Sequence, residues 1–472
     1  MALAGRHWIL AAGLLAGCAA AENSASPIIP RIQVARRVAR IDIRSDVRAF
    51  DVGDSALYVA TLRDSSGSVL VDRPSFWSSS DTSVAIVERS GLVRTVGVGA
   101  ARISLTAESV TAHVDISVAA DPVTQVAVGN VFACALRRSG RLFCWGSAPN
   151  GYFERATDVF RQFSWRSIVA AYGTICGVTT DRDAYCWGSN NFGQIGDGGQ
   201  TDQPSPRLVA GGRKWASLHR VIYATCGVEH ITARIFCWGG VGSTGSEASP
   251  SPTPTLLPSV TVAAEGNEQV TAGSAHLCGR NPNLGFWCIG ATGVGQWTTP
   301  RTLAGPAFIA SAVAIGMGKT CNVTSAGEAF CFGENDGSTL SNGDGRVGTL
   351  FVESAPRLAP TVRWKSFAQG IAFHYCGIDV NDRGYCWGTN YSGQVGNGST
   401  VFQSTPSLLP GHWQQFAIGM GIHGWSNRNF TCGLSTAHEV LCWGEAARGQ
   451  LGESGIATAL TPRRVRIPQV TP

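Results

Sequence analysis

The stretch Cys176-Gly177-Val178…Tyr185-Cys186-Trp187-Gly188 places two cysteines ten residues apart on either side of the polar turn Asp181-Arg182-Asp183. Two apolar runs that flank such a turn predict a β-hairpin. An even spacing sets the cysteines directly opposite one another on the two strands, within reach of a disulfide. The stretch therefore predicts a hairpin that is cross-linked by its own disulfide.

The same pattern recurs along the chain. Fourteen of the fifteen cysteines form pairs, six of them ten residues apart and one eleven, and the first cysteines recur after 42 to 56 residues. The predicted disulfides join Cys134 to Cys144, Cys176 to Cys186, Cys226 to Cys237, Cys278 to Cys288, Cys321 to Cys331, Cys376 to Cys386 and Cys432 to Cys442. A period near fifty residues indicates a solenoid or a propeller. Seven cysteine pairs therefore predict an all-β repeat of seven units. The hairpin strands are apolar on both faces and need neighbours on both sides, which blades packed around a propeller axis provide.

Other recurring residues complete each unit. A tryptophan lies upstream of several hairpins and marks a further strand; these are Trp165, Trp215, Trp364 and Trp413. The tryptophan of each Trp-Gly dipeptide is interpreted as core, and the Gly-Gln-x-Gly segments as structural turns. In the third pair we expect the extra residue to lengthen the turn or to form a bulge. We also expect the strand-like residues 463–467 to complete the blade begun by residues 121–146, which would leave no open edge.

These units resemble a known repeat. Tyr185-Cys186-Trp187-Gly188…Gly193-Gln194-Ile195-Gly196 and Tyr385-Cys386-Trp387-Gly388…Gly393-Gln394-Val395-Gly396 look like repeats of the regulator of chromosome condensation family, and Trp443-Gly444…Gly449-Gln450-Leu451-Gly452 repeats the pattern. The resemblance covers residues 121–472. It implies a seven-bladed β-propeller.

Residues 36–119 contain no cysteine and form a separate unit. Their apolar residues alternate in short runs divided by turn signals, which predicts a β-sandwich. The run Phe76-Trp77-Ser78-Ser79-Ser80-Asp81-Thr82-Ser83-Val84-Ala85, followed by Gly91-Leu92-Val93, resembles a bacterial Ig-like group 2 domain. The resemblance implies an N-terminal Ig-like spacer.

The N-terminus has the features of an export signal. Arg6 precedes a short apolar segment that is too short to span a bilayer, within residues 1–17. Leu15-Ala16-Gly17-Cys18 resembles a bacterial lipoprotein signal, which implies that Cys18 is acylated and begins the mature chain, with residues 18–35 as a tether. Ala19 stands where an Asp would retain the chain in the inner membrane, so we expect an outer-membrane or surface position. Disulfides persist in exported proteins.

Charge and motifs exclude several functions. The net charge is only +5, and no basic stripe indicates nucleic-acid binding. Two GxGxxG matches, Gly240 to Gly245 and Gly419 to Gly424, lack the helix that a dinucleotide site needs. We expect no cofactor, no metal site and no catalytic residues.

Residues that do not repeat are the better candidates for function, because loops at the ends of a propeller are free to vary. The candidates for partner binding are Tyr152, Phe153, Phe192, Trp297, Tyr391, His423 and Trp425. The leading hypothesis is a monomeric, non-enzymatic, lipid-anchored envelope protein whose propeller binds a protein, or alternatively a glycan. Guanine-nucleotide exchange on a small GTPase, the activity of the founding member of the family, is a second hypothesis. An enzyme with a pocket at a propeller end is a third.

Overall fold

The structure is a computed structural model. It describes residues 36–44, 49–52, 54–240, 251–261, 270–272, 276–281, 285–291, 296–302, 308–316, 319–334, 349–350, 357–370, 374–419, 429–453 and 455–468. All regular elements in these ranges are β-strands, which confirms the all-β fold. Within the same ranges, no helix has the length and apolar character needed to cross a membrane.

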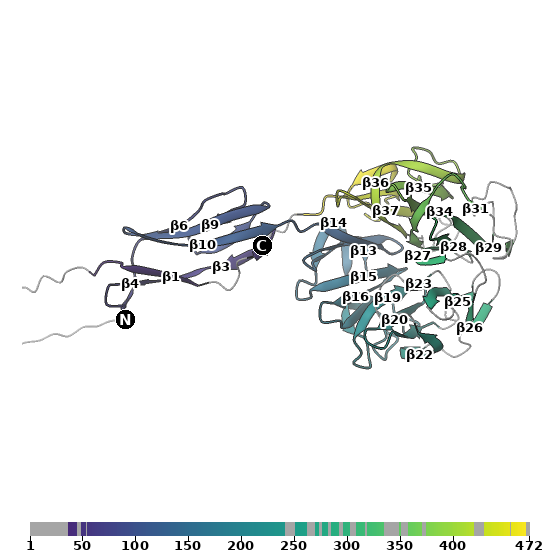
Figure 1. Ribbon diagram of the computed structural model, residues 1–472, viewed down its shortest axis with the longest axis horizontal. Coiled ribbons are helices and arrows are strands. Elements are labelled where there is room, and N and C mark those ends of the chain that lie inside the picture. Colours follow the sequence, from purple (N-terminus) through teal and green to yellow (C-terminus); the bar gives the residue numbers. More distant parts are fainter. Residues whose placement is uncertain are drawn as a thin grey trace, which may run out of the picture.

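The first ten strands form an elongated unit beside a ring of sheets (Figure 1). They are β1 (Arg40–Arg44), β2 (Ala49–Asp51), β3 (Ser55–Leu57), β4 (Val59–Arg63), β5 (Val69–Leu70), β6 (Ser75–Ser79), β7 (Ala85–Val87), β8 (Leu92–Thr95), β9 (Gly99–Ala107) and β10 (Val110–Ala119). Sheet β2-β10-β9-β6 and sheet β3-β8-β7 contribute to one core, which includes Val93, Ile103 and Ile116. Along β9 and β10 buried residues alternate with exposed ones, as expected for strands with one face in a core.

Four sheets of four consecutive strands make up the first part of the ring. Their strands are β11 (Val123–Val128), β12 (Phe132–Arg137), β13 (Leu142–Ala148) and β14 (Gly151–Val159); β15 (Trp165–Ala171), β16 (Thr174–Thr179), β17 (Ala184–Gly188) and β18 (Gln203–Leu208); β19 (Trp215–Arg220), β20 (Ala224–Glu229), β21 (Arg234–Gly239) and β22 (Ser251–Thr261); β23 (Val270–Ala272), β24 (His276–Asn281), β25 (Gly285–Ala291) and β26 (Gln296–Thr302). We call each such sheet a blade.

The remaining strands continue the ring. They are β27 (Phe308–Gly316), β28 (Lys319–Thr324), β29 (Ala329–Glu334), β30 (Thr349–Leu350), β31 (Arg357–Leu358), β32 (Trp364–Phe367), β33 (Gln369–Gly370), β34 (His374–Asp379), β35 (Arg383–Gly388), β36 (Gln403–Gly419), β37 (Phe430–Ser435), β38 (Val440–Glu445) and β39 (Thr458–Arg464). The long strand β36 pairs with β35 through its first part and with β37 through its second part. It therefore serves as the outer strand of one blade and the inner strand of the next.

Each predicted cysteine pair has disulfide geometry across a hairpin, with Cα atoms 4.0 to 4.1 Å apart. In the strand register Cys134 lies opposite Cys144, Cys176 opposite Cys186, Cys226 opposite Cys237, Cys278 opposite Cys288, Cys321 opposite Cys331, Cys376 opposite Cys386 and Cys432 opposite Cys442. The structure therefore pairs these fourteen cysteines as the spacing predicts, and no bridge joins two different hairpins among them.

Two further expectations about the hairpins agree with the structure. In the third hairpin the cysteines still face one another, because the extra residue lies in the turn between Glu229 and Arg234. The upstream tryptophans lie on the innermost strands: Trp165, Trp215 and Trp364 begin β15, β19 and β32, and Trp413 lies in the second part of β36.

The Gly-Gln-x-Gly segments join neighbouring blades. The indole Nε1 of Trp238 donates to the backbone carbonyl of Gln194 (3.0 Å), and Trp443 donates in the same way to Gln394 (2.8 Å). Gly196 lies so close to the ring of Trp238 that a Cβ atom there would approach Nε1 to 2.5 Å. The segment therefore needs glycine because the next blade's tryptophan packs against its backbone.

Closure of the ring differs from the expectation. Strand β39 pairs with β38, so the C-terminal strand completes the last hairpin's own sheet, and the prediction that it joins residues 121–146 is wrong. Blade β11–β14 is built entirely from its own segment. Side chains make the closure instead: Trp145 Nε1 donates to the Gln450 carbonyl (2.9 Å), and Gln415 hydrogen-bonds both backbone groups of Val126.

We predict that Gln415→Ala lowers the free energy of unfolding by about 1–3 kcal/mol, because it removes two hydrogen bonds across the closure. Gln414→Ala is the matched control. Gln414 is an exposed neighbour, and its replacement should change stability by less than about 0.5 kcal/mol. Urea denaturation of the two variants measures the difference. Equal midpoints would show that Gln415 does not hold the ring closed.

Candidate functional site

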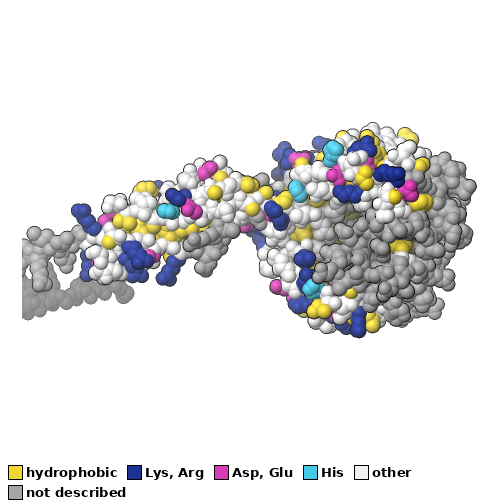
Figure 2. All heavy atoms as spheres, viewed as in Figure 1, with side chains coloured by type: hydrophobic (Ala, Val, Ile, Leu, Met, Phe, Trp, Pro, Cys, Tyr) yellow, Lys and Arg dark blue, Asp and Glu magenta, His cyan; other side chains and the backbone are white. Residues whose placement is uncertain are grey.

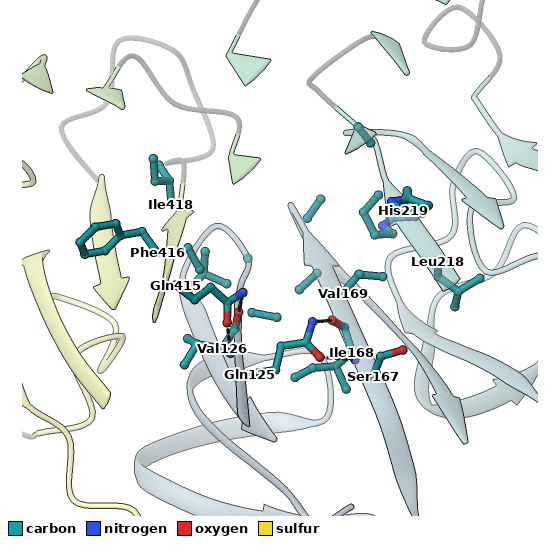
Figure 3. Close-up of a pocket in the computed structure, with 18 of the residues that line it drawn as sticks. Gln125, Val126, Ser167, Ile168, Val169, Leu218, His219, Gln415, Phe416 and Ile418 are labelled. Atoms are coloured by element: carbon teal, nitrogen blue, oxygen red, sulfur yellow. Dashed lines mark hydrogen bonds between the residues drawn. The ribbon is translucent and has the colours of Figure 1, made fainter. Parts of the chain in front are cut away.

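The innermost strands of the ring surround a central cavity of about 350 Å³. Strands β11, β15, β19, β23, β32 and β36 all contribute to its lining, so the cavity lies where the blades converge (Figure 3). A volume of this size is at the lower end of the range for small-molecule pockets. The cavity is therefore the first candidate site.

Two glutamines bridge adjacent inner strands at the wall of this cavity. Gln125 Nε2 donates to the Ile168 carbonyl (2.7 Å), and its Oε1 accepts from the Ile168 N–H (3.0 Å). Gln415 makes the same two bonds to Val126: its Nε2 donates to the Val126 carbonyl (3.0 Å), and its Oε1 accepts from the Val126 N–H (2.9 Å) (Figure 3). Each glutamine side chain thus links the inner strands of two adjacent blades by bonding both backbone groups of one residue, as a paired strand would.

Serine occupies the equivalent position in other blades. Gln125 and Gln415 each follow a shift in strand register, and Ser167, Ser217 and Ser366 follow the same shift in their strands. A serine side chain is too short to bridge to the next strand as glutamine does. Ser217 Oγ instead lies 2.9 Å from His219 Nε2 within its own strand. The wall therefore presents serine hydroxyls on the side of β15 and β19.

Strand β19 carries a histidine and an arginine where most of its counterparts carry small or apolar residues. His219 pairs with the first cysteine of its hairpin, as do Ala127, Val169 and Ala417 in other blades. Both His219 and Arg220 are 6 % exposed and line the cavity. Burial lowers the pKa of His219 to about 4, so its ring is neutral at pH 7.

An aromatic cluster lies on the turns beside these strands. Tyr172, in the turn after β15, also lines the cavity, and its ring centroid is 6.0 Å from that of Tyr223. Tyr223 in turn lies 4.6 Å from Phe192. Phe192 and Tyr223 are 37 % and 39 % exposed, so the cluster offers aromatic surface to a partner.

Tyr152, Phe153 and Tyr391 lie apart from this cluster. Tyr152 and Phe153 lie on β14, where Tyr152 packs against Gly449 of the loop that closes the ring. Tyr391 is 65 % exposed in the loop after β35. Trp297 lies on β26, although its side chain is outside the described part of the structure. Cys18, His423 and Trp425 also lie outside the described residues.

The sequence analysis missed Tyr172, Tyr223, His219 and Arg220. Alignment of the repeat units by their first cysteines would have shown the last two. Trp165-Arg166-Ser167-Ile168-Val169-Ala170 and Trp215-Ala216-Ser217-Leu218-His219-Arg220 have the same register, and only the second ends in two polar residues.

Charged groups elsewhere are mixed in sign. Lys and Arg side chains lie beside Asp and Glu side chains on the face that Figure 2 shows, and surface pairs such as Arg102–Asp115 (2.7 Å) are part of this pattern. In the part of the chain that the structure describes, no three His, Cys, Asp or Glu side chains lie close enough together to hold a metal ion.

The repeats of this chain match those of known proteins. Residues 123–152 and 165–194 match one profile of the regulator of chromosome condensation (RCC1) repeat, and residues 183–234 match another. The human probable E3 ubiquitin-protein ligase HERC4 is 28 % identical over 203 residues, which are 38 % of this chain and 19 % of HERC4. The ultraviolet-B receptor UVR8 of Arabidopsis thaliana is 25 % identical over 307 residues, 59 % of this chain and 64 % of UVR8. The chain spans about a fifth of the length of the HERC4 relatives that it matches.

A solved structure gives the same fold. Prp20p from Saccharomyces cerevisiae, studied for its binding properties to Gsp1p and histones, superposes with a TM-score of 0.56 at 16 % identity. The superposition covers 73 % of this chain and 87 % of that chain. The chain therefore carries RCC1 repeats and contains an RCC1-type β-propeller, as its sequence predicted.

We predict that His219 makes the protein less stable in mild acid. An unfolded chain binds a proton at this histidine below pH 6.5, whereas the folded chain does so only near pH 4. The free energy of unfolding is therefore not reduced by this histidine above pH 6.5. It falls as the pH drops from 6.5 toward 4, by up to about 1.4 kcal/mol per pH unit. His219→Gln should reduce this slope in urea denaturation across the window. Identical slopes for the two proteins would refute the assignment.

Proposed function

We propose that this protein is a non-enzymatic binding module whose propeller captures another protein, with a glycan as the alternative partner. The observation that carries the proposal is the cluster of Phe192, Tyr223 and Tyr172 on short turns of a disulfide-linked frame. Aromatic side chains held rigidly at a surface lose little conformational freedom on binding. The similarity to Prp20p, studied for binding to Gsp1p and histones, supports protein capture as a use of this fold.

We infer seven blades over residues 121–472, one for each disulfide hairpin. The support is the common register of the seven disulfides and the repeated inner strand with its tryptophan. We infer further that residues 36–119 are an Ig-like sandwich that acts as a spacer. The core shared by sheets β2-β10-β9-β6 and β3-β8-β7 supports this assignment.

The proposed setting is the cell envelope, at the outer membrane or the cell surface. Residues 1–17 would direct export, Cys18 would carry the lipid, and residues 18–35 would form the tether. Fourteen cysteines in disulfide geometry support an oxidising compartment, because such bonds are rare in the cytosol. The protein is proposed to act as a monomer on this anchor.

The binding proposal is tested by affinity capture from envelope extracts with the mature, oxidised chain. We predict that Phe192→Ala and Tyr223→Ala each weaken binding of the captured protein at least about tenfold, since buried aromatics dominate interface energies. Ile231→Ala is the control, because Ile231 is an exposed apolar side chain, 82 % exposed, that lies outside the cluster. A partner that binds all three variants equally would contradict the proposed surface, and turnover of a small substrate without a stable partner would contradict the function.

The anchor proposal is tested at Cys18. We predict that Cys18→Ala abolishes incorporation of labelled palmitate and leaves an unprocessed precursor, because the thiol that accepts the acyl chain is gone. Ala19→Asp should keep the lipid and move the protein to the inner membrane. Mass spectrometry of the mature N-terminus and membrane fractionation provide the measurements. Unchanged acylation of the Cys18→Ala protein would exclude this residue as the attachment site.

A further inference from the structure

One sheet of the N-terminal unit, residues 36–119, carries basic and apolar side chains on its outer face. The strand register pairs Arg40 with Arg63, Asp42 with Thr61, Arg44 with Val59, and Arg63 with Val69. Because side chains alternate between the two faces of a strand, these seven residues share one face of sheet β1-β4-β5. Ile41 and Leu62 belong to the other face and are buried in the core. We call the first set the basic face.

Positive charge is concentrated on this side of the unit. Residues 36–119 contain ten arginines, no lysine and ten acidic residues, so their net charge is zero. Residues 36–44 and 59–71, which include all three strands of the sheet, contain five arginines and two aspartates, a net charge of +3. The rest of the unit is therefore net negative. Figure 2 shows arginine side chains in dark blue along the side of the unit where Figure 1 places β1 and β4.

The two aspartates leave this positive charge exposed. Asp42 lies between two arginines, and it accepts from Arg40 Nε (2.6 Å) and from Arg63 Nε (3.1 Å). Asp64 is buried and accepts from two backbone N–H groups of its own turn. The Arg40 side chain is still 73 % exposed, and Arg44 is exposed as well. The charge that the basic face presents to solvent is therefore positive.

Apolar side chains are exposed next to these arginines. Val59 and Val69 lie on the basic face, Val71 follows directly after β5, and each of the three is more than half exposed. Single exposed apolar residues are common on soluble proteins, but here they share one small sheet with exposed arginines. Basic and apolar groups on one surface suit the boundary of a phospholipid bilayer, where cations meet the headgroups and apolar groups reach the acyl region.

The basic face lies close in sequence to the proposed lipid anchor. Only 21 residues separate Cys18 from Arg40. A fully extended chain of that length spans at most roughly 75 Å, so an anchored chain would hold the face within this distance of the bilayer. Such confinement raises the effective concentration of the bilayer, and weak contacts are then enough for binding. This step rests on the proposed anchor, whereas the composition of the face does not.

We propose that the basic face binds the surface of a bilayer that contains anionic phospholipid. Arg40 and Arg44 contact headgroup phosphates, and Val69 and Val71 contact the outer end of the acyl region. An arginine suits this partner because its parallel N–H groups match two oxygens of a phosphate. The N-terminal unit then lies against the membrane and sets the direction in which the chain continues to the propeller, which a passive spacer would not do.

The test is partition of the mature, oxidised chain without its lipid onto vesicles of equal parts phosphatidylglycerol and phosphatidylcholine, at low salt. We expect at least about tenfold weaker partition onto vesicles of phosphatidylcholine alone, and loss of binding in about 0.5 M NaCl, because salt screens the contact. Omission of the lipid separates this test from the anchor proposal. Acylation of Cys18 can fail while the face still binds, and the face can fail while Cys18 is still acylated.

The double variant Arg40→Gln/Arg44→Gln should bind the anionic vesicles at least about tenfold more weakly than the wild type. Arg89→Gln/Arg102→Gln is the matched control, because it removes two exposed arginines from other parts of the same unit and lowers the net charge equally. This control should bind like the wild type. Val71→Asp should also weaken binding, and thermal unfolding checks that each variant is folded.

Three outcomes would overturn the proposal. In the first, the wild type binds anionic vesicles no better than vesicles of phosphatidylcholine alone. In the second, the two double variants lose binding equally, which would indicate a response to net charge and not to this face. In the third, the wild type binds heparin but not the vesicles, which would indicate a polyanionic glycan as the partner of the basic face.

Discussion

Three junctions of the ring depend on the same interaction between blades: a buried tryptophan indole that donates a hydrogen bond to the loop of the neighbouring blade. Trp145, Trp238 and Trp443 are at most 1 % exposed, and each indole donates to the backbone carbonyl of the glutamine in a neighbouring blade's loop. Each bond satisfies a buried N–H that is costly to leave without an acceptor, although the indole of Trp187 has no such partner among the described residues. Buried Asn190 and Asn390 hold the loops that supply the carbonyls of Gln194 and Gln394, through their side-chain amides.

The same kind of contact explains how the chain closes without exchanging a strand between its ends. Trp145 uses the carbonyl of Gln450, and Gln415 bonds Val126, so the last blade meets the first through contacts of the kind that join consecutive blades. Arg137 adds a bond to the Pro468 carbonyl (3.1 Å), and His438 Nδ1 lies 2.9 Å from the Val123 carbonyl. Each terminal blade can therefore be built from its own segment.

Chemical specialisation lies where the repeat departs from its own pattern. Glutamine at the inner-strand position bridges two blades at the cavity wall, and the serines at the same position line the cavity without making that bridge. His219 and Arg220 stand at registers where most other blades have apolar residues, and they bury polar groups at a cost in free energy. The frame and the cavity therefore depend on different residues. The disulfide hairpins and the tryptophan contacts between blades form the frame, and the irregular strand β19 contributes the unusual polar residues of the cavity.

The hairpins, their disulfides and the repeat could be predicted from sequence because each depends on residues about ten apart, and local spacing fixes strand register. Closure could not, since Gln415 and Val126 are 289 residues apart and no pattern indicates which distant backbone a glutamine will meet. The cluster of Phe192, Tyr223 and Tyr172 could not be predicted either. Its residues lie on three turns of two blades and come together only when the blades pack. The sequence by itself determined the repeated unit, and the tertiary structure decided which irregular residues converge on one cavity.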